Sequence, residues 1–242
     1  MDLSVVVPVR NEADNLAPLM GEISQALEGL YAFEFIYVDD GSTDDTLLRL
    51  KELGHEYPRL RVLRHRKGHG QSSALLTGIR AARGGTVATL DGDGQNDPTD
   101  LPHLLETLTE LLRGNPAAMV VGHRKHRKDT RWRNFSSYIA NAVRGRLLGD
   151  DTPDTGCGLK VFPRELYLSL PCFDHMHRFL PALVQRSGGI VVSVDVNHRP
   201  RLHGKSNYGT WNRLWVGIVD MFGVMWMQNR AIECEGEEIE FT

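Results

Sequence analysis

The sequence predicts an α/β fold in which helices flank a mainly parallel sheet. Short β-branched segments alternate with longer segments in which apolar residues recur three and four positions apart. Such alternation is typical of parallel strands joined by right-handed helical crossovers. The chain has 242 residues, of which 41% are hydrophobic and 24% charged. These values fit a large globular domain and exclude a disordered or fibrous chain.

The expected strands are short and rich in aliphatic residues, at Leu3–Val7, Phe33–Val38, Arg61–Leu63, Thr86–Leu90, Met119–Val121 and Ile190–Val196. Helical spacing of apolar residues predicts helices between the first five strands, at Asn15–Leu30, Asp44–Leu53, Gln71–Ala82 and Pro98–Leu112. Beyond about residue 131 the alternation stops and helical patterns dominate, at Arg133–Leu148, Asp174–Ser187 and Tyr208–Met227.

Two helix starts carry local signals. The segment Ser42–Asp45 resembles a capping box, and Asp97 precedes Pro98 as an N-cap precedes proline at the first helical position. The change of pattern suggests one domain over residues 1–210, with 1–122 as a nucleotide-binding half and 123–210 as an acceptor-facing half. Residues 211–230 then form an amphipathic helix, and 231–242 form an acidic tail.

Charge and cysteine content limit the partners and the compartment. The net charge is −3, so nucleic acid is not an expected partner, although residues 124–146 carry eight Lys or Arg against one acid. The three cysteines form no CxxC pair, and no signal-peptide pattern precedes the first strand. We therefore expect a cytoplasmic protein.

The segment Tyr208–Met227 combines tryptophans with aliphatic residues but is interrupted by Asp220. No segment reaches the ~20 apolar residues of a membrane span. The pattern fits a helix lying in the bilayer interface with its tryptophans at the headgroups, or equally a helix packed on the domain. The first interpretation predicts a peripheral protein on the inner face of the cytoplasmic membrane.

Two acidic clusters follow expected strands, at Asp39–Ser42 and at Asp91–Gln95. Ligands of open parallel sheets bind beyond the carboxyl ends of the strands, and crowded carboxylates there suit Mg²⁺ or Mn²⁺. Asp and Gly are also ordinary turn and cap residues, but two acids and an amide exceed what one cap needs. No GxxxxGK[ST] or early GxGxxG is present, which disfavours a Walker loop and a dinucleotide cofactor.

Three motifs in this order, Val7–Glu12, Val38–Thr46 and Asp91–Gln95, resemble those of glycosyltransferase family 2. More closely, the chain is similar to the dolichol- and undecaprenyl-phosphate sugar synthases over roughly residues 3–210. The resemblance implies a GT-A fold and transfer of a sugar, with inversion, from a nucleotide-sugar donor such as a GDP- or UDP-sugar.

The resemblance also implies roles for single residues. Those that would line the nucleotide site are Pro8, Arg10, Glu12, Val38, Asp40, Asp91 and Gly92. The residues that would hold the metal are Asp91, Asp93 and Gln95. Arg10 stands where the family usually has Tyr, at the base contact.

Basic residues then follow an expected strand. Arg133, Ser137 and Asn141 share one helix face, and with Arg124 they could gather around a phosphate or simply form a solvated basic face. The resembled enzymes have an Arg after this strand and R-x-x-x-S on the next helix. That similarity assigns Arg133 and Ser137 to the acceptor phosphate and leaves Arg124 with either the donor or the acceptor.

Two further segments resemble family motifs. Asp154–Phe162 is similar to D-x-G-x-G-[LF]-[KR], which makes Asp154 the candidate general base or acceptor orienter, unless it only forms a turn. His198–Tyr208 is similar to a loop that closes over the donor. In that loop Arg201 and Lys205 would contact the donor phosphates and Ser206 the acceptor phosphate.

The resulting hypothesis is an inverting, metal-dependent transferase that forms a polyprenyl-phosphate sugar, with Asp93, Asp154, Arg124, Arg133 and Arg201 as its catalytic residues. One alternative is a soluble family 2 enzyme acting on a saccharide or other hydroxyl. An alternative of another class is a non-catalytic protein that binds nucleotide sugars. The sequence leaves the oligomeric state open.

Overall fold

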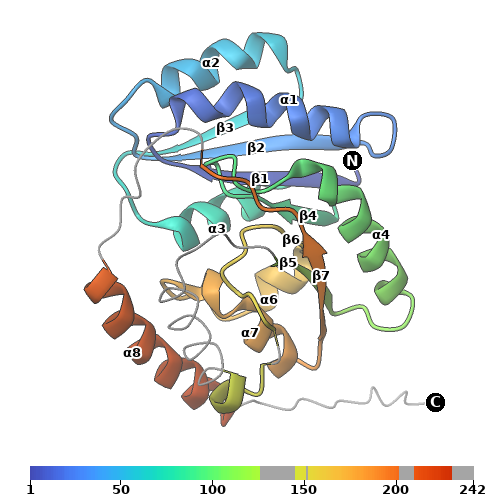
Figure 1. The fold of residues 1–242 in the computed structure, drawn as a ribbon, viewed down its shortest axis with the longest axis vertical. Coiled ribbons are helices and arrows are strands. Elements are labelled where there is room, and N and C mark those ends of the chain that lie inside the picture. The colour runs from blue at the N-terminus through green and yellow to red at the C-terminus, as the bar shows by residue number, and fades with distance from the viewer. Residues whose placement is uncertain (126–144, 151, 202–209, 231–242) are drawn as a thin grey trace, which may run out of the picture.

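The computed structural model describes residues 1–125, 145–150, 152–201 and 210–230 (Figure 1). In this part of the chain one seven-stranded sheet has the order β3-β2-β1-β4-β6-β5-β7. Its strands are β1 Leu3–Val9, β2 Phe33–Asp40, β3 Leu60–His65, β4 Thr86–Thr89, β5 Ala118–Arg124, β6 Lys160–Pro163 and β7 Ile190–Val196. Only β6 runs antiparallel to its neighbours, and all other pairs are parallel.

The α-helices of the described residues are α1 Leu16–Leu27, α2 Thr46–Glu56, α3 Gln71–Ala81, α4 Leu101–Leu112, α6 Arg164–Ser169, α7 Leu180–Arg186 and α8 Thr210–Gln228. Short 3-10 turns cover Ala13–Asn15, Pro98–Asp100 and Met176–Arg178. No helix in the described ranges is both long and apolar enough to cross a bilayer.

The expected α/β class is confirmed, and all six expected strands are present with ends that differ by a few residues. The expected helix Asp174–Ser187 is wrong in its first turn, because His175 has a left-handed φ of 62° and α7 begins only at Leu180. Of the expected helix Arg133–Leu148, residues 145–148 are described and helical. Strand β6 and helix α6 were not expected.

The two predicted helix starts had different outcomes. The Asp97 carboxylate accepts a hydrogen bond from Thr99 N at 3.1 Å, so the Asp97 N-cap is confirmed. The capping box at Ser42 is wrong, since α2 begins four residues later and the Ser42 hydroxyl instead accepts from Asn11 N at 2.9 Å. Ser42 therefore joins the loops after β1 and β2.

Two layers of helices cover the two faces of the sheet. On one face α1, α2 and α4 pack through residues such as Ile23 and Leu104, which are fully buried (Figure 1). On the other face α3, α6 and α7 pack through residues such as Ile79 and Leu183, and Val224 of α8 joins them. Each such aliphatic side chain contributes roughly 1.5–3 kcal/mol of burial.

A glycine brings α3 close to the sheet. A Cβ at Gly78 would lie 2.5 Å from Val6 and 3.1 Å from Val38, so no larger residue fits without movement. This close approach places the first residue of α3, Gln71, beside the loop that follows β4, where its side chain contacts Asp91.

A buried carboxylate ties the amino-terminal edge of the sheet together. Glu34 accepts three hydrogen bonds of 2.7 Å each, from Ser4 Oγ, Arg61 Nη1 and Arg83 N. Burial alone would raise the pKa of Glu34 above its ordinary value of 4.5, but the hydrogen bonds and the Arg61 charge hold it below that value. The ionised form of Glu34 thus stabilises the fold.

Candidate active site

The loops after β1, β2 and β4 meet at one edge of the sheet. Asn11, in a left-handed conformation with φ 56°, accepts a hydrogen bond from Thr43 N at 2.8 Å. Because Asn tolerates this conformation better than most residues, the turn after β1 can reach the turn after β2. Since β2 and β4 both pair with β1, the two acidic clusters predicted from the sequence follow the strands on either side of β1.

Asp40, at the end of β2, holds the loop 66–70 that precedes α3. Its two oxygens accept from the backbone N–H groups of His69 and Gly70, both at 2.8 Å, and one oxygen lies 2.7 Å from His65 Nδ1. Asp40 was expected to line the nucleotide site. It lies at the expected edge, but its carboxylate is engaged in shaping this loop.

Arg10 lies against the same loop. A Cβ at Gly68 would come within 2.6 Å of Arg10 Nη1, and a Cβ at Gly41 would come within 2.6 Å of Gly68 N. A side chain at position 68 would therefore clash with the Arg10 guanidinium, and one at position 41 would clash with the backbone of the loop 66–70. Arg10 and Lys67 place positive charge near the turn after β2.

Two carboxylates follow β4. Asp91 Oδ1 accepts from Gln71 Nε2 at 2.8 Å, and Asp93 Oδ1 accepts from Gln95 N at 3.1 Å. Burial and the nearby charge of Asp93 raise the pKa of Asp91, while Lys160 and Arg124 oppose that rise. Two carboxylates that repel each other in a partly buried loop favour a bound cation.

This donor set fits a divalent ion. No group of three or more His, Cys, Asp or Glu side chains converges within the described residues. Mg²⁺ commonly uses one or two carboxylates and takes its other oxygens from water and substrate phosphates, so Asp91 and Asp93 suffice. Gln95, the third expected ligand, donates through Nε2 to the carbonyl oxygen of Arg199 at 3.4 Å.

Arg201, which follows the edge strand β7, also reaches this loop. Its Nη2 donates to Glu12 Oε1 at 2.6 Å and lies 3.4 Å from Asp93 Oδ2. Burial raises the pKa of Glu12, the hydrogen bond from Asn15 and the Arg201 charge oppose that rise, and the charge of Asp93 adds to it. Three of the expected site residues are thus in one cluster.

A buried ion pair lies near Asp91, since the charge of Arg124 opposes the rise that burial causes in the pKa of Asp91. Arg124 donates from Nε and Nη2 to the two carboxylate oxygens of Asp154, at 2.6 and 2.8 Å, and both side chains are 10% exposed. Burial by itself lowers the pKa of Arg124, but the hydrogen bonds and charge of Asp154 outweigh it and raise that pKa. The sequence proposed separate phosphate and base roles for these residues, and the structure pairs them.

Lys160 is a second buried cation that the sequence analysis did not single out. Its Nζ donates to the carbonyl oxygen of Cys157. Burial lowers the pKa of Lys160, and the charges of Cys157, Asp91 and Asp154 oppose this. One sequence signal was the [KR] position that ends the pattern D-x-G-x-G-[LF]-[KR]. A lysine at the start of an aliphatic strand could have indicated a buried charge.

Gly158, between Cys157 and Lys160, lies directly behind Asp91 in the loop 91–95, here called the acidic loop. A Cβ there would come within 2.3 Å of the Asp91 carboxylate, and its carbonyl oxygen accepts from Thr89 Oγ1 at 2.7 Å. Asp91 is therefore confined between this turn and Gln71 of α3.

The remaining expected residues differ in position. Gly92 packs under Val9 and the carbonyl oxygen of Pro8, where a Cβ would lie 2.5 and 3.0 Å away. Val38 is fully buried in the core against α3, so its side chain does not face the site, contrary to expectation. The residues Arg133, Ser137, Lys205 and Ser206 lie outside the described part of the chain.

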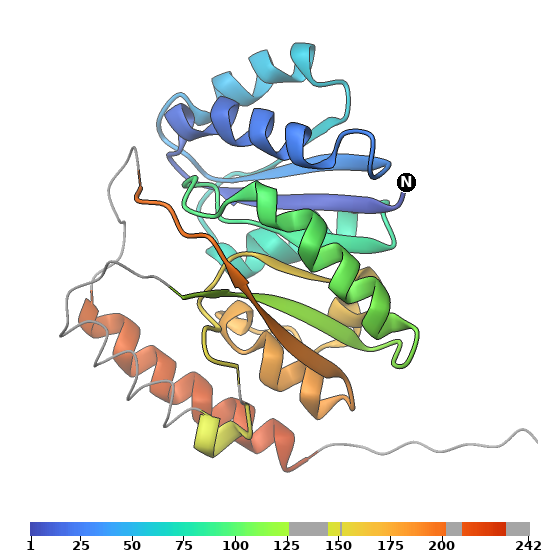
Figure 2. The ribbon, with the colours of Figure 1, turned by 45° about the vertical axis from the view of Figure 1, so that its right-hand side comes forward.

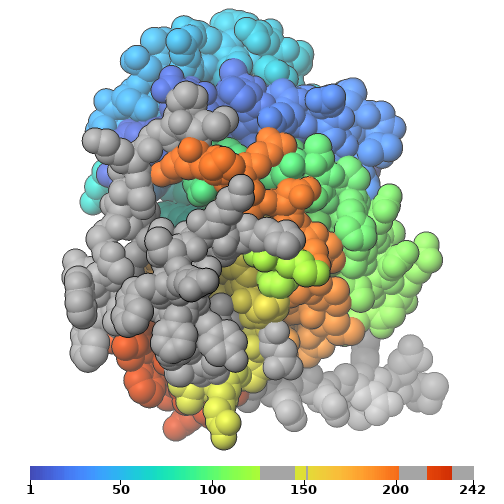
Figure 3. Space-filling model, viewed as in Figure 1, coloured from blue at the N-terminus to red at the C-terminus, as the bar shows by residue number. Residues whose placement is uncertain are grey.

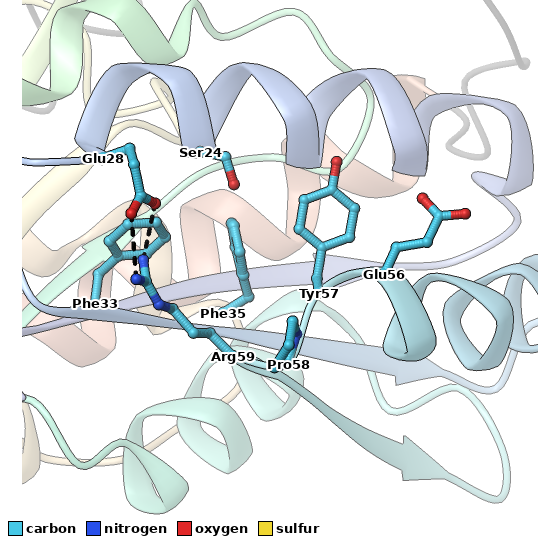
Figure 4. Close-up of a pocket in the computed structure, with 8 residues that line it drawn as sticks. All are labelled: Ser24, Glu28, Phe33, Phe35, Glu56, Tyr57, Pro58 and Arg59. Carbon is cyan, nitrogen blue, oxygen red and sulfur yellow. Dashed lines mark hydrogen bonds and ion pairs between the residues drawn. The ribbon is translucent and has the colours of Figure 1, made fainter.

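A cavity of about 290 Å³ lies elsewhere, between α1 and the turn that precedes β3 (Figure 4). Arg59 crosses its mouth, with Nη1 2.9 Å from Glu28 and its guanidinium 4.9 Å from the centre of the Phe33 ring. Phe33 begins β2, whereas the acidic cluster lies at the end of that strand. This cavity is therefore at the opposite edge of the sheet from the candidate site.

Comparison with known proteins identifies related sequences. The sequence profile of glycosyl transferase family 2 matches residues 4–170. The chain is 38% identical to a dodecaprenyl-phosphate galacturonate synthase of Rhizobium johnstonii, over 93% of this chain and 67% of the relative. It is 31% identical to an undecaprenyl-phosphate 4-deoxy-4-formamido-L-arabinose transferase of Aeromonas hydrophila, over 86% of this chain and 63% of that relative.

A solved structure shares the fold. Glucosyl-3-phosphoglycerate synthase from Mycobacterium tuberculosis, in complex with Mn²⁺, UDP-glucose and phosphoglyceric acid, has a TM-score of 0.64 to this chain at 22% identity. The match covers 96% of this chain and 81% of that one. The expected GT-A fold is thereby confirmed.

Proposed function

Because the chain belongs to glycosyltransferase family 2, we propose that it transfers a sugar from a nucleotide-sugar donor to a polyprenyl phosphate. The curated relatives described above are named for polyprenyl-phosphate sugar transfer, and they support this acceptor class. The chain spans 67% and 63% of their lengths. The activity and the acceptor of the relatives are therefore proposals for this chain.

The observation that carries the proposal is the ion pair between Arg124 and Asp154. Both oxygens of Asp154 accept hydrogen bonds from one guanidinium, which leaves this carboxylate poorly suited to remove a proton. A hydroxyl acceptor needs a general base. A phosphate monoester, with a second pKa near ~6, is already mostly dianionic at neutral pH and needs none.

The transfer itself then requires position and charge. An oxygen of the acceptor phosphate attacks the anomeric carbon as the bond from that carbon to the donor diphosphate breaks, and the sugar inverts. Arg124, fixed by Asp154, orients a phosphate. Arg201 supplies N–H groups to the diphosphate that leaves.

Asp91 and Asp93 would hold a divalent cation, Mg²⁺ or Mn²⁺. Its chemistry is to neutralise the charge that builds up on the leaving diphosphate. The solved neighbour named above contains Mn²⁺ with a UDP-sugar, which supports a metal of this kind. Gln71 and Gly158 hold Asp91 from two sides, so the first ligand is positioned before the donor arrives.

Helix α8 would bring the acceptor's membrane to the site. Val219, Phe222 and Trp226 are 60%, 60% and 63% exposed and recur at spacings of three and four, so they share one face. An exposed apolar stripe that contains Trp suits the bilayer interface. We propose that the protein binds peripherally at the cytoplasmic membrane face through this stripe.

The test is a transfer assay with purified protein, Mn²⁺ or Mg²⁺, a polyprenyl phosphate and a panel of labelled nucleotide sugars. Nucleotide donors of galacturonate are tried first, because the 38% identical relative is named for galacturonate. We expect label to enter the organic phase only with metal, and not with Asp93→Ala. Glu52→Ala, which removes an exposed carboxylate on α2, is the matched control and should be active.

Two results would count against the proposal. Label that stays in the aqueous phase while free nucleotide is still released would mean that the acceptor is a hydroxyl compound or water. Full activity of Asp93→Ala would mean that the acidic loop does not hold the metal. For the membrane, flotation with anionic vesicles should fail for Phe222→Ser and Trp226→Ser, and unchanged flotation would refute that role of α8.

A further inference from the structure

The chain after β7 forms a strap across the acidic loop, here defined as residues 197–201. Asn197 N donates to Asp100 at 2.8 Å, and Arg199 N donates to the carbonyl oxygen of Gln95 at 2.9 Å. His198 pairs with Asn96 in an isolated bridge. Figures 1 and 2 show the strap as the orange chain that leaves β7 and runs toward the ends of β1 and β2.

Arg199 anchors the strap on a second element. Its guanidinium contacts Asp97 at 2.6 Å and Glu22 of α1 at 2.7 Å. In the space-filling view the strap lies over the green loop after β4 (Figure 3). With backbone and side-chain anchors along its length, the strap fixes where Arg201 can reach.

Because the strap is anchored in this way, Arg201 at its end lies between two carboxylates. Its Nη2 contacts Glu12 at 2.6 Å and Asp93 at 3.4 Å. Its Nε is buried and has no hydrogen-bond partner among the described residues. A guanidinium with one end on a metal ligand and another donor unused is positioned to exchange partners.

We propose that Arg201 is an internal cation that competes with the metal for Asp93 and makes metal binding depend on the nucleotide. The inference rests on the metal site of the proposed function and goes beyond it. Without nucleotide, a divalent ion at Asp93 lies beside the Arg201 guanidinium, and the two positive charges repel each other. With nucleotide, the diphosphate lies between the two cations and accepts hydrogen bonds from Arg201, including from the unused Nε.

The consequence is a coupling between two ligands. If the nucleotide tightens Mn²⁺ binding by some factor, Mn²⁺ must tighten nucleotide binding by the same factor. Such couplings typically amount to about 5- to 150-fold. The Arg201 guanidinium thus weakens the binding of free metal at Asp93 and favours binding of the metal together with a diphosphate.

The test measures Mn²⁺ affinity by titration calorimetry and by Mn²⁺ electron paramagnetic resonance, with Mn²⁺ alone and with saturating UDP or GDP. Arg201→Gln should bind Mn²⁺ alone at least about 5-fold more tightly than wild type, while its coupling to nucleotide falls by at least the same factor. Arg201→Lys keeps the charge and should lie between the two. Arg49→Gln removes an equal charge from an exposed ion pair on α2 and should match wild type.

In Arg201→Gln the affinity for Mn²⁺ alone should rise while the coupling to nucleotide falls. A structural role predicts something else, because a damaged site would bind Mn²⁺ more weakly both with and without nucleotide. The inference is overturned if Arg201→Gln binds Mn²⁺ alone no more tightly than wild type, or if Arg49→Gln tightens it equally. If wild-type protein binds no Mn²⁺ even with UDP or GDP, the metal site of the proposed function fails, and the inference fails with it.

Discussion

Replacing Asp154 with asparagine removes the negative charge opposite Arg124 and nearly preserves the side-chain volume. Removal of one partner from a buried ion pair costs roughly 3–5 kcal/mol. Both side chains here are 10% exposed, and asparagine keeps one acceptor, so we expect the lower end, about 3 kcal/mol. In a chain of 242 residues each kcal/mol lowers Tm by roughly 2–4 °C. The variant should therefore melt about 6–12 °C lower.

The activity of the same variant distinguishes the two acceptor classes. A general base contributes roughly 10²–10⁴-fold to a rate. If the acceptor is a phosphate dianion, Asp154 only positions Arg124, and kcat of Asp154→Asn should fall by less than about 100-fold. The assay is transfer of label from nucleotide sugar to polyprenyl phosphate, at a temperature well below the variant's Tm.

A loss of more than about 10³-fold in kcat, with the folded state intact, would refute this reasoning and point to Asp154 as a base. The matched control is Asp195→Asn, which removes the same charge from an exposed pair with Lys125. Its Tm and kcat should equal those of wild type. Arg124→Lys keeps the charge but loses the two-point contact, so it should resemble Asp154→Asn in stability.

Three further outcomes follow from the packing and the buried charges. Gly158→Ala places a Cβ 2.3 Å from the Asp91 carboxylate. It should weaken Mn²⁺ binding in the presence of UDP by at least about tenfold, or 1.4 kcal/mol, and unchanged binding would separate Asp91 from the metal. Gly78→Ala overpacks α3 against Val6 and should cost about 1–3 kcal/mol in urea unfolding, whereas a neutral result would mean that α3 can move. The pKa of Glu34 lies below its unfolded value of 4.5, so its ionisation stabilises the fold above about pH 4.5 and that stabilisation is lost as the pH falls. Glu34→Gln should therefore be less stable than wild type at pH 7, and the gap should narrow between pH 5 and pH 3 in thermal unfolding scans. A constant gap would contradict the assignment.

The strands β1, β2, β4 and β5 were predictable because most of their residues are buried and include short apolar runs. Strand β6 was not, since it has four residues, begins with a buried Lys160 and ends at Pro163. No local pattern marks such a strand, which gains its place from pairing with β4 and β5. For the same reason the capping box at Ser42 was wrong, because the Ser42 hydroxyl is used by a loop from a distant part of the sequence.

The candidate site was predictable where its residues follow strand ends. Asp91, Asp93 and Glu12 all follow strands whose carboxyl ends share one edge, and this relation is visible in the sequence. The pairing of Arg124 with Asp154 was not visible, since each residue alone suits another role. The role of Gln71 was not predictable, because it depends on one contact with Asp91 that exists only since α3 lies so close to the sheet.

The clamp between Arg124 and Asp154 also joins two points 30 residues apart in the chain. Arg124 ends β5, and Asp154 lies shortly before β6. When an ion pair joins the two ends of a segment, doubling the length of that segment costs only about 0.6 kcal/mol in closure entropy. A change in the length of the chain between Arg124 and Asp154 should therefore cost little, as long as the pair itself is kept.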